Sequence, residues 1–178
     1  MATIPIPLLL ISGPVGVGKT TVGNEVSSSL ERRGVAHTFI DMDALAWTYP
    51  RPSDDRFGDR LALLNLRGVW ANCAAKGSNN LIVARVVETQ SDIENIHDAV
   101  PGCQPLVCQL RANDETLIER VRTRELGSGC DRHEARALEL ARSLQNKAPA
   151  DFVVDTDGRL ASDNADEIVG QVEWAIVC

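Results

Sequence analysis

A glycine-rich segment near the start of the sequence has the residue types of a phosphate-binding loop. The stretch "GPVGVGKTT" follows the apolar run "PLLLIS" and fits the pattern G-x-x-x-x-G-K-[ST]. Its fixed positions are Gly13, Gly18, Lys19 and Thr20. Glycines let backbone N–H groups approach a triphosphate, the lysine reaches the β and γ phosphates, and the threonine hydroxyl can bind Mg²⁺. We therefore expect ATP and Mg²⁺ to bind here. The residues expected to contact the nucleotide are Gly13, Val15, Gly16, Val17, Gly18, Lys19, Thr20 and Thr21.

Two aspartates follow the second expected strand, in "HTFIDMDALAW". Asp41 and Asp43 stand two residues apart, so their side chains can point the same way while Met42 turns toward the core. One carboxylate can hold Mg²⁺ through water, and the other can accept the proton of an attacking hydroxyl. We expect Thr20 and Asp41 to bind the metal, although the two aspartates could exchange roles. Alternatively, they only cap the following helix, for which Asp43 before "ALAW" is a suitable N-cap.

Arginines are concentrated in a third region of the chain. They are Arg111, Arg120, Arg122, Arg124, Arg132 and Arg136, with the glycines of "ELGSGC" among them. Guanidinium groups suit the charge that develops on a transferring phosphoryl group, and their planes stack on purines. Arg120 and Arg124 are four residues apart and share a helix face. We expect Arg120 to contact the nucleotide, Arg124 to act in catalysis, and the segment around 125–133 to close as a lid. Ordinary surface ion pairs are the alternative.

The acceptor pocket is expected in "ALAWTYPRPSDDRF", directly after the aspartate pair. Its aromatic residues offer a flat apolar wall, and its arginines offer an anion contact. Arg85 interrupts an otherwise apolar strand, and a buried arginine needs an anionic partner. That partner could be a protein carboxylate, such as Glu88, or a group on the substrate. The residues expected to bind the acceptor are Asp43, Trp47, Arg56 and Arg85.

Short apolar runs alternate with helical patterns along the whole chain. The expected strands are Leu8–Ser12, Ala36–Ile40, Leu81–Val87, Leu106–Leu110 and Phe152–Val154. The expected helices are Lys19–Arg32, Asp55–Ala75, Asp92–Val100, "DETLIERVRTREL" capped by Asn113, "HEARALELARSLQNK" and "NADEIVGQVEWAIV". Continuous apolar runs are typical of buried parallel strands. The alternation predicts an α/β fold, with a parallel sheet covered by helices on both faces, in one domain over residues 1–178.

The charge and composition of the chain argue against several classes of binding partner and of protein. A net charge of −7 argues against nucleic acid or an acidic membrane as a partner, because phosphate groups are bound by basic surfaces. The apolar run at the amino terminus is far shorter than a bilayer span, so we expect a cytoplasmic protein. Five cysteines occur without C-x-x-C spacing, which favours reduced and mostly buried thiols over disulfides or a zinc site.

Other nucleotide-binding classes fit less well. A GTPase should carry D-x-x-G and then N-K-x-D, whereas "DTDG" here follows "NKAP" and the final aspartate is missing. We interpret both fragments as chance matches. No LSGGQ-like signature of transporter ATPases occurs.

The order of "GPVGVGKTT", "DMD" and "ERVRTRE" resembles the small P-loop kinases, among them shikimate kinase, gluconate kinase, chloramphenicol phosphotransferase and the nucleoside monophosphate kinases. The resemblance implies a five-stranded parallel sheet of the P-loop NTPase type with a mobile, arginine-rich lid. It also implies that Lys19 and Thr20 hold the phosphates and Mg²⁺. The aspartate pair would serve metal and acceptor hydroxyl. Arg120, in an R-x-x-x-R pattern with Arg124, would resemble the arginines at the base of the lid that stack on adenine and contact phosphate. After the third strand this chain has "LIVARVVETQSD", where shikimate kinases carry a glycine-rich turn and nucleotide kinases a "DGFPR"-like stretch.

We therefore expect an ATP-dependent phosphotransferase that acts on a hydroxyl group of a small metabolite or antibiotic. The residues expected to act in catalysis are Lys19, Asp41, Asp43 and Arg124. Two alternatives stay open: a nucleoside or nucleotide kinase, and a regulatory protein that binds ATP without transferring its phosphoryl group. A homodimer is possible, and the sequence does not identify the acceptor.

Overall fold

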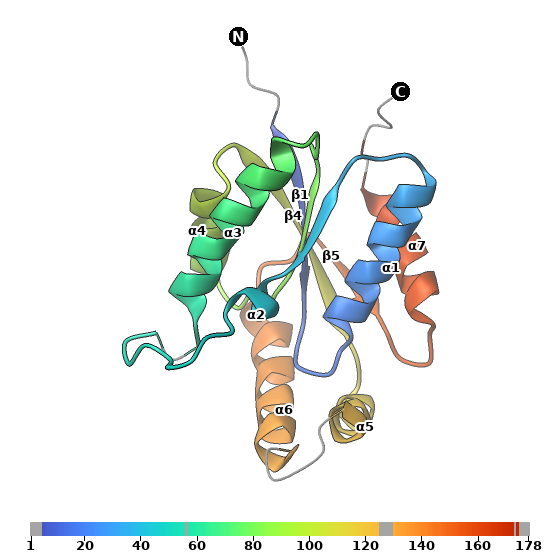
Figure 1. Ribbon diagram of the computed structural model, residues 1–178. Helices are drawn as coiled ribbons and strands as arrows, with labels where there is room; N and C mark the ends of the chain where they lie inside the picture. Colours follow the sequence, from blue (N-terminus) through green and yellow to red (C-terminus); the bar gives the residue numbers. More distant parts are fainter. Residues whose placement is uncertain (1–4, 56, 125–129, 173, 175–178) are drawn as a thin grey trace.

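Five parallel strands form a single sheet in the order β2-β3-β1-β4-β5. The structure, a computed structural model, describes residues 5–55, 57–124, 130–172 and 174, and all of their side chains except those of 124, 130–132, 146 and 147. The strands are β1 (Ile6–Ser12), β2 (Thr38–Asp41), β3 (Leu81–Ala84), β4 (Cys103–Arg111) and β5 (Phe152–Asp155). Strand β1 lies at the centre, between β3 and β4 (Figure 1). The expected α/β fold with a five-stranded parallel sheet is therefore confirmed.

Helices cover both faces of the sheet (Figure 1). They are α1 (Lys19–Arg32), α3 (Asp59–Ala74), α4 (Gln90–Ala99) and α7 (Ala161–Gln171). Helices α1 and α7 pack on one face, and α3 and α4 pack on the other. In β1, Leu9 and Ile11 join the first of these layers, whereas Leu8 and Leu10 join the second. Both sides of the strand are buried, which explains why "PLLLIS" is continuously apolar rather than alternating.

Three further helices lie near the carboxyl ends of the strands (Figure 1). They are α2 (Met42–Leu45), α5 (Asp114–Arg124) and α6 (Cys130–Lys147). The side-chain oxygen of Asn113 accepts the N–H of Thr116 at 2.8 Å, so the expected cap of α5 is confirmed. Of the expected lid, residues 130–133 form the first turn of α6, and 125–129 lie outside the described residues. Within the described ranges, no helix has both the length and the apolar character needed to cross a membrane.

Several element boundaries differ from the sequence-based expectation, and at two of them side chains take up backbone hydrogen bonds. Strand β3 ends at Ala84 rather than Val87, and the N–H of Val87 donates to the hydroxyl of Ser12 at 2.9 Å. Helix α4 begins earlier than Asp92, because Thr89 and Asp92 form a reciprocal capping box. Arg85 therefore follows β3 and does not interrupt it.

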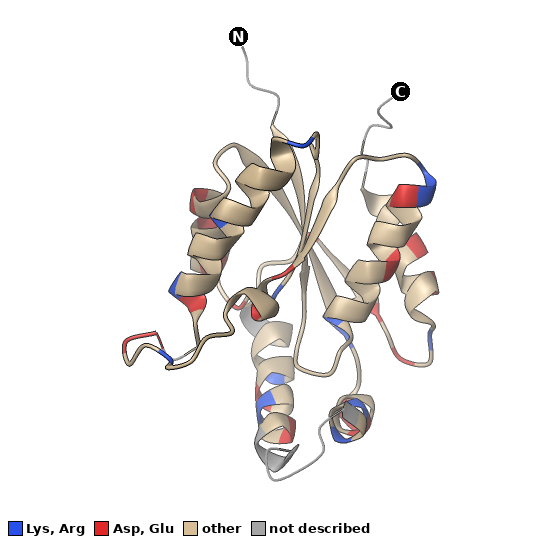
Figure 2. Ribbon diagram, viewed as in Figure 1, with Lys and Arg blue, Asp and Glu red and all other residues tan. Residues whose placement is uncertain are grey.

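Charged residues within the strands occur only where a strand ends. Figure 2 shows that the sheet is otherwise free of them. Asp41, Arg111 and Asp155 are the last residues of β2, β4 and β5, and no other charged residue lies in the five strands that the structure describes. Because the strands are parallel, these three ends meet at one edge of the sheet. The apolar interior and the polar edge are thus separated along each strand.

Two of the cysteines are buried thiols. Cys103 and Cys108 lie in β4 and are free and buried. Burial raises the pKa of Cys103 to about 11, and burial together with nearby Glu167 raises the pKa of Cys108 to about 12. Both thiols are therefore protonated at neutral pH, and the expectation of reduced, buried cysteines holds for these two positions.

Gly13 marks the closest approach of the glycine-rich loop to the sheet. Its φ angle is 149°, and a Cβ at this position would lie 2.8 Å from the carbonyl oxygen of Leu110 and 2.8 Å from a methyl carbon of Val17. The carbonyl belongs to β4 and is held in the sheet, so it cannot move aside. Only glycine lets the chain leave β1 this close to β4.

We predict that Gly13→Ala destabilises the protein by about 1–3 kcal/mol, because the added methyl group overlaps the β4 backbone. The matched control is Gly68→Ala in the middle of α3, where a Cβ would have no neighbour within 4 Å. That change should stabilise by up to about 1 kcal/mol through helix propensity. Urea-induced unfolding measures both free energies. Equal stability of the two variants would contradict the close approach at Gly13.

Candidate active site

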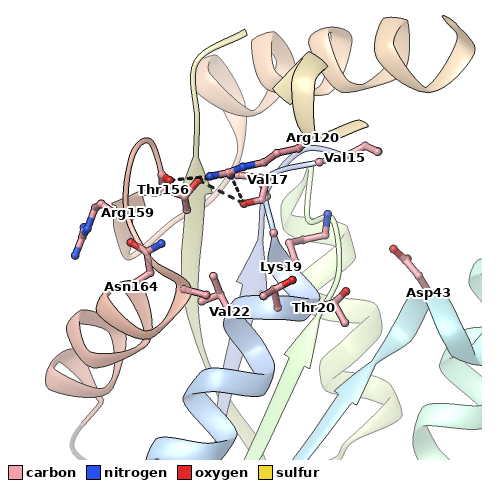
Figure 3. A pocket seen from close by; sticks show the side chains of 14 residues that line it. Val15, Val17, Lys19, Thr20, Val22, Asp43, Arg120, Thr156, Arg159 and Asn164 are labelled. Carbon is pink, nitrogen blue, oxygen red and sulfur yellow. Dashed lines mark hydrogen bonds between the residues drawn. The ribbon is translucent and has the colours of Figure 1, made fainter. Parts of the chain in front are cut away.

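A pocket of about 380 Å³ lies at the carboxyl edge of the sheet (Figure 3). Its walls come from the glycine-rich loop with the first turn of α1, from α2, from α5, from the segment that joins β5 to α7, and from the first turns of α7. The lining residues are Val15, Gly16, Val17, Gly18, Lys19, Thr20, Thr21, Val22, Asp43, Arg120, Thr156, Arg159, Ala161 and Asn164. Ligands of open parallel sheets bind outside the carboxyl ends of the strands, which is where this pocket lies.

The amino terminus of α1 opens into the pocket. Gly18 is its N-cap, with a left-handed φ of 101° and, among the described residues, no side-chain hydrogen bond to the cap. A Cβ on Gly18 would meet nothing within 4 Å, so the backbone angle, and not crowding, is what favours glycine. The N–H groups of the first helical turn and the positive end of the helix dipole thus face the cavity. This is the arrangement in which proteins bind phosphate groups.

Lys19 lies across the mouth of the loop. Its Nζ donates hydrogen bonds to the carbonyl oxygens of Gly13 at 3.0 Å and Pro14 at 3.1 Å. These two bonds hold the ammonium group over the loop, beside the N–H groups of α1 (Figure 3). A positive side chain and a helix amino terminus therefore converge on one end of the pocket, which we call the phosphate end.

Thr20 connects the loop to the end of β2. Its hydroxyl donates to a carboxylate oxygen of Asp41 at 2.7 Å, and the other carboxylate oxygen accepts the N–H of Asp43 at 3.0 Å. Asp41, and not Asp43, is therefore the N-cap of the following helix. A hydroxyl and a carboxylate side by side beside a phosphate-binding loop match the way proteins hold Mg²⁺, which takes one or two protein oxygens and completes its shell with phosphates and water.

Asp43 faces the phosphate end from the first turn of α2 (Figure 3). Arg85 approaches it from the end of β3, with a guanidinium nitrogen 4.0 Å from a carboxylate oxygen of Asp43. Arg85 also forms an ion pair with Asp59, the first residue of α3. Its side chain is only 18% exposed. The anionic partners that this arginine requires are thus Asp59 and Asp43.

Glu88 is not the partner of Arg85. Its carboxylate accepts hydrogen bonds from Arg136 at 3.0 Å and from Ser143 at 3.4 Å. Both donors belong to α6, so Glu88 fixes that helix to the segment after β3. Of the possible partners of Arg85, Glu88 is therefore excluded, because its carboxylate faces α6.

Arg120 crosses the pocket between the glycine-rich loop and the β5–α7 segment. It donates to the carbonyl oxygen of Val17 at 3.1 Å, to the hydroxyl of Thr156 at 3.0 Å and to the carbonyl oxygen of Thr156 at 2.9 Å (Figure 3). The guanidinium group is therefore held rigidly in the pocket wall by groups from two loops. A fixed guanidinium plane is suited to stacking on a purine.

The segment after β5 supplies pocket residues that the sequence-based expectation missed. Thr156, Arg159 and Asn164 line the cavity on the side away from Asp43 (Figure 3). Thr156 lies within "DTDG" and Arg159 follows it directly. From the sequence we interpret this fragment as a chance match to a GTPase motif. The fragment is not a GTPase motif, but it follows the carboxyl end of a parallel strand. Its position alone could have indicated a ligand-binding segment, because ligands bind at the carboxyl ends of parallel strands.

Some of the expected site residues do not line the pocket, and others are not described by the structure. Trp47 and Tyr49 are 85% and 96% exposed and do not line it. Arg56 and the side chain of Arg124 lie outside what the structure describes. Arg122 forms a two-pronged ion pair with Glu134 at 2.8 and 2.9 Å, in keeping with the surface-pair alternative.

Comparison by sequence identifies no relative: neither models of known families nor curated protein sequences match this chain. Comparison with solved structures does identify similar proteins. A gluconokinase from Sinorhizobium meliloti 1021 aligns over 95% of this chain and 97% of its own, with 17% identity and a TM-score of 0.59. A tunicamycin resistance protein from Deinococcus radiodurans aligns over 95% and 96%, with 18% identity and a TM-score of 0.63. A shikimate kinase from Acinetobacter baumannii, in complex with shikimate, aligns over 95% and 93%, with 20% identity and a TM-score of 0.55.

These similarities extend over almost the full length of each chain. At 17–20% identity they establish the fold and not the substrate. The resemblance inferred from "GPVGVGKTT" and "DMD" is thus confirmed at the level of architecture: the chain has the P-loop fold that small kinases share.

Proposed function

We propose that this protein is a small-molecule kinase that transfers the γ-phosphoryl group of ATP to a hydroxyl group. The observation that carries the proposal is the position of Asp43, whose carboxylate faces Lys19 and Thr20 across the phosphate end of the pocket (Figure 3). A nucleotide bound by the loop would present its terminal phosphate toward this carboxylate. A protein that only binds nucleotide has no need of a carboxylate there, which weakens the regulatory alternative.

Each residue at the phosphate end has a separate task in this proposal. The loop N–H groups and Lys19 hold the phosphates and offset their charge. Thr20 and Asp41 would hold Mg²⁺, which supplies further positive charge at the transferring group. Asp43 orients the acceptor hydroxyl and accepts its proton. Arg85 keeps the Asp43 carboxylate in place, because Asp59 in turn fixes the guanidinium group. Catalysis is then mainly positioning and charge neutralisation.

The acceptor would approach from the side of α2 and α3, next to Asp43. The exposed rings of Trp47 and Tyr49 lie in the segment that joins these helices, and they could cover a bound small molecule. A hydroxyl-bearing metabolite or antibiotic fits this proposal, and a nucleoside or nucleotide acceptor is the alternative within the kinase class.

We predict that Asp43→Asn lowers turnover by about 100-fold or more while ATP affinity stays within about threefold, because the amide cannot accept the proton. Lys19→Ala should weaken both ATP binding and turnover. The assay is transfer of labelled phosphate from ATP to a panel of sugars, hydroxy acids, nucleosides and antibiotics. Asp98→Asn makes the same chemical change at an exposed side chain outside the pocket and should behave as wild type. Full turnover in Asp43→Asn would refute the role of this carboxylate.

We also predict that Asp41→Asn raises the Mg²⁺ concentration needed for half-maximal ATP binding by about 10–100-fold, because the amide loses the charge that holds the ion through water. Titration of Mg²⁺ against binding of a fluorescent ATP analogue measures this directly. Asp43→Asn serves as the matched variant and should leave the Mg²⁺ requirement within about threefold. A shift in Asp43→Asn and none in Asp41→Asn would reverse the two assignments.

A further inference from the structure

Among the described residues that line the pocket, one buried side-chain oxygen has no hydrogen-bond partner. Asn164 belongs to the first turns of α7, and only 2% of the residue is exposed. Its carboxamide oxygen is buried and accepts no hydrogen bond from any described residue. The neighbouring side chains that line this part of the pocket, Val22 and Ala161, are apolar. An asparagine with an unpaired oxygen is therefore placed where an apolar residue would otherwise be expected.

The other two polar side chains that line this part of the pocket, Thr156 and Arg159, form hydrogen bonds within the chain. The Thr156 hydroxyl accepts from Arg120 at 3.0 Å and lies 3.1 Å from the carbonyl oxygen of Arg111. Arg159 donates to Glu167 at 2.6 Å and to the carbonyl oxygens of Asp155 and Asp163 at 3.3 Å. Asp157, in the same segment, also has a buried carboxylate oxygen without a partner among the described residues, but Asp157 does not line the pocket. Among the described residues that line the pocket, the Asn164 oxygen is the one buried side-chain acceptor without a partner. Burying an unpaired acceptor opposes folding, so its retention indicates a partner that is supplied from outside the chain.

The place of Asn164 in the pocket narrows the choice of partner. Lys19 and Thr20 mark the phosphate end, whereas Asn164 lies beyond Thr156 on the other side of Arg120 (Figure 3). A phosphate group is an acceptor and cannot satisfy a carbonyl oxygen. With its triphosphate on the loop, a nucleotide would extend its base toward this wall, beside the guanidinium group of Arg120. The missing partner is then a hydrogen-bond donor carried by the base.

We propose that Asn164 selects the base of the donor nucleotide, by accepting a hydrogen bond from the exocyclic amino group of adenine. Guanine and hypoxanthine carry an oxygen at that position, and an oxygen cannot donate to the carboxamide oxygen. The terminal torsion of asparagine is broad and roughly two-fold, so rotation about it can exchange the positions of the oxygen and the nitrogen and turn the oxygen toward a bound base. This inference rests on the proposed function, because it assumes that the loop holds the triphosphate. It adds to that function a residue that determines which nucleotide is used.

The test is a double-mutant cycle between the protein and the nucleotide. The protein is changed by Asn164→Leu, which has a similar size and no acceptor. The nucleotide is changed from ATP to purine riboside triphosphate, which lacks only the amino group. Equilibrium dissociation constants are measured by calorimetry with Mg²⁺ and without an acceptor substrate. Removing the amino group should weaken binding to the wild-type protein about tenfold, and Asn164→Leu should weaken ATP binding by a similar factor. Binding of purine riboside triphosphate should change less than twofold on mutation.

A merely structural role for Asn164 gives a different pattern. In that case Asn164→Leu would weaken the binding of both nucleotides by the same factor, and this result would overturn the proposal. Unchanged dissociation constants for both nucleotides would overturn it as well. Thermal unfolding without nucleotide provides a second readout: Asn164→Leu should unfold at the same or a higher temperature, because it removes an unpaired buried acceptor. Tighter wild-type binding of GTP than of ATP would also overturn the proposal.

The cycle measures binding alone, so its result is separate from that of the transfer assay. If the coupling is present and no acceptor is phosphorylated, Asn164 selects adenine and the kinase proposal fails. If transfer occurs and the coupling is absent, the kinase proposal stands and the role of Asn164 is refuted. If neither nucleotide binds the wild-type protein, both are refuted.

Discussion

The parallel direction of all five strands is the constraint on which the rest of the structure depends. It places every carboxyl end at one edge of the sheet, so that the polar residues following β1, β2 and β3 gather there although they are far apart in the chain. Along the strands the core is apolar on both faces, and no charged group is tolerated before the last residue. The candidate active site is therefore assembled at the carboxyl edge of the sheet, where the charged last residues of β2, β4 and β5 lie.

Short hydrogen bonds then join the segments that meet at this edge. Thr20 links the phosphate-binding loop to β2 through Asp41, and Arg120 links the same loop to the segment after β5. Asp59 and Arg85 extend the network from α3 to Asp43. The site is thus supported from several elements at once, which is what preorganised positioning of a phosphoryl group requires.

The sequence predicted the fold well, and it placed the glycine-rich loop correctly between β1 and α1, because both depend on local patterns. Continuous apolar runs identified the strands, and "GPVGVGKTT" identified the loop by spacing alone. The rest depends on contacts between distant segments. No local pattern indicates that Arg85 faces Asp59 or that Glu88 faces Arg136, since each pair lies more than twenty residues apart. The β5–α7 side of the pocket is not indicated by any sequence motif. Only the position of "DTDG" directly after a parallel strand points to it. The exposure of Trp47 and Tyr49 likewise follows from tertiary packing that propensity does not encode.

The central claim is that the phosphate loop and Asp43 together pass a phosphoryl group to a small molecule. The most direct measurement supplies the wild-type protein with ATP that carries ¹⁸O in its γ-phosphoryl group, together with a mixture of cell metabolites, and follows the label by mass spectrometry. The account predicts that the labelled phosphoryl group appears as an ester on an organic hydroxyl compound. Label that stays in ATP, or that appears only in inorganic phosphate across mixtures of every acceptor class, would contradict it.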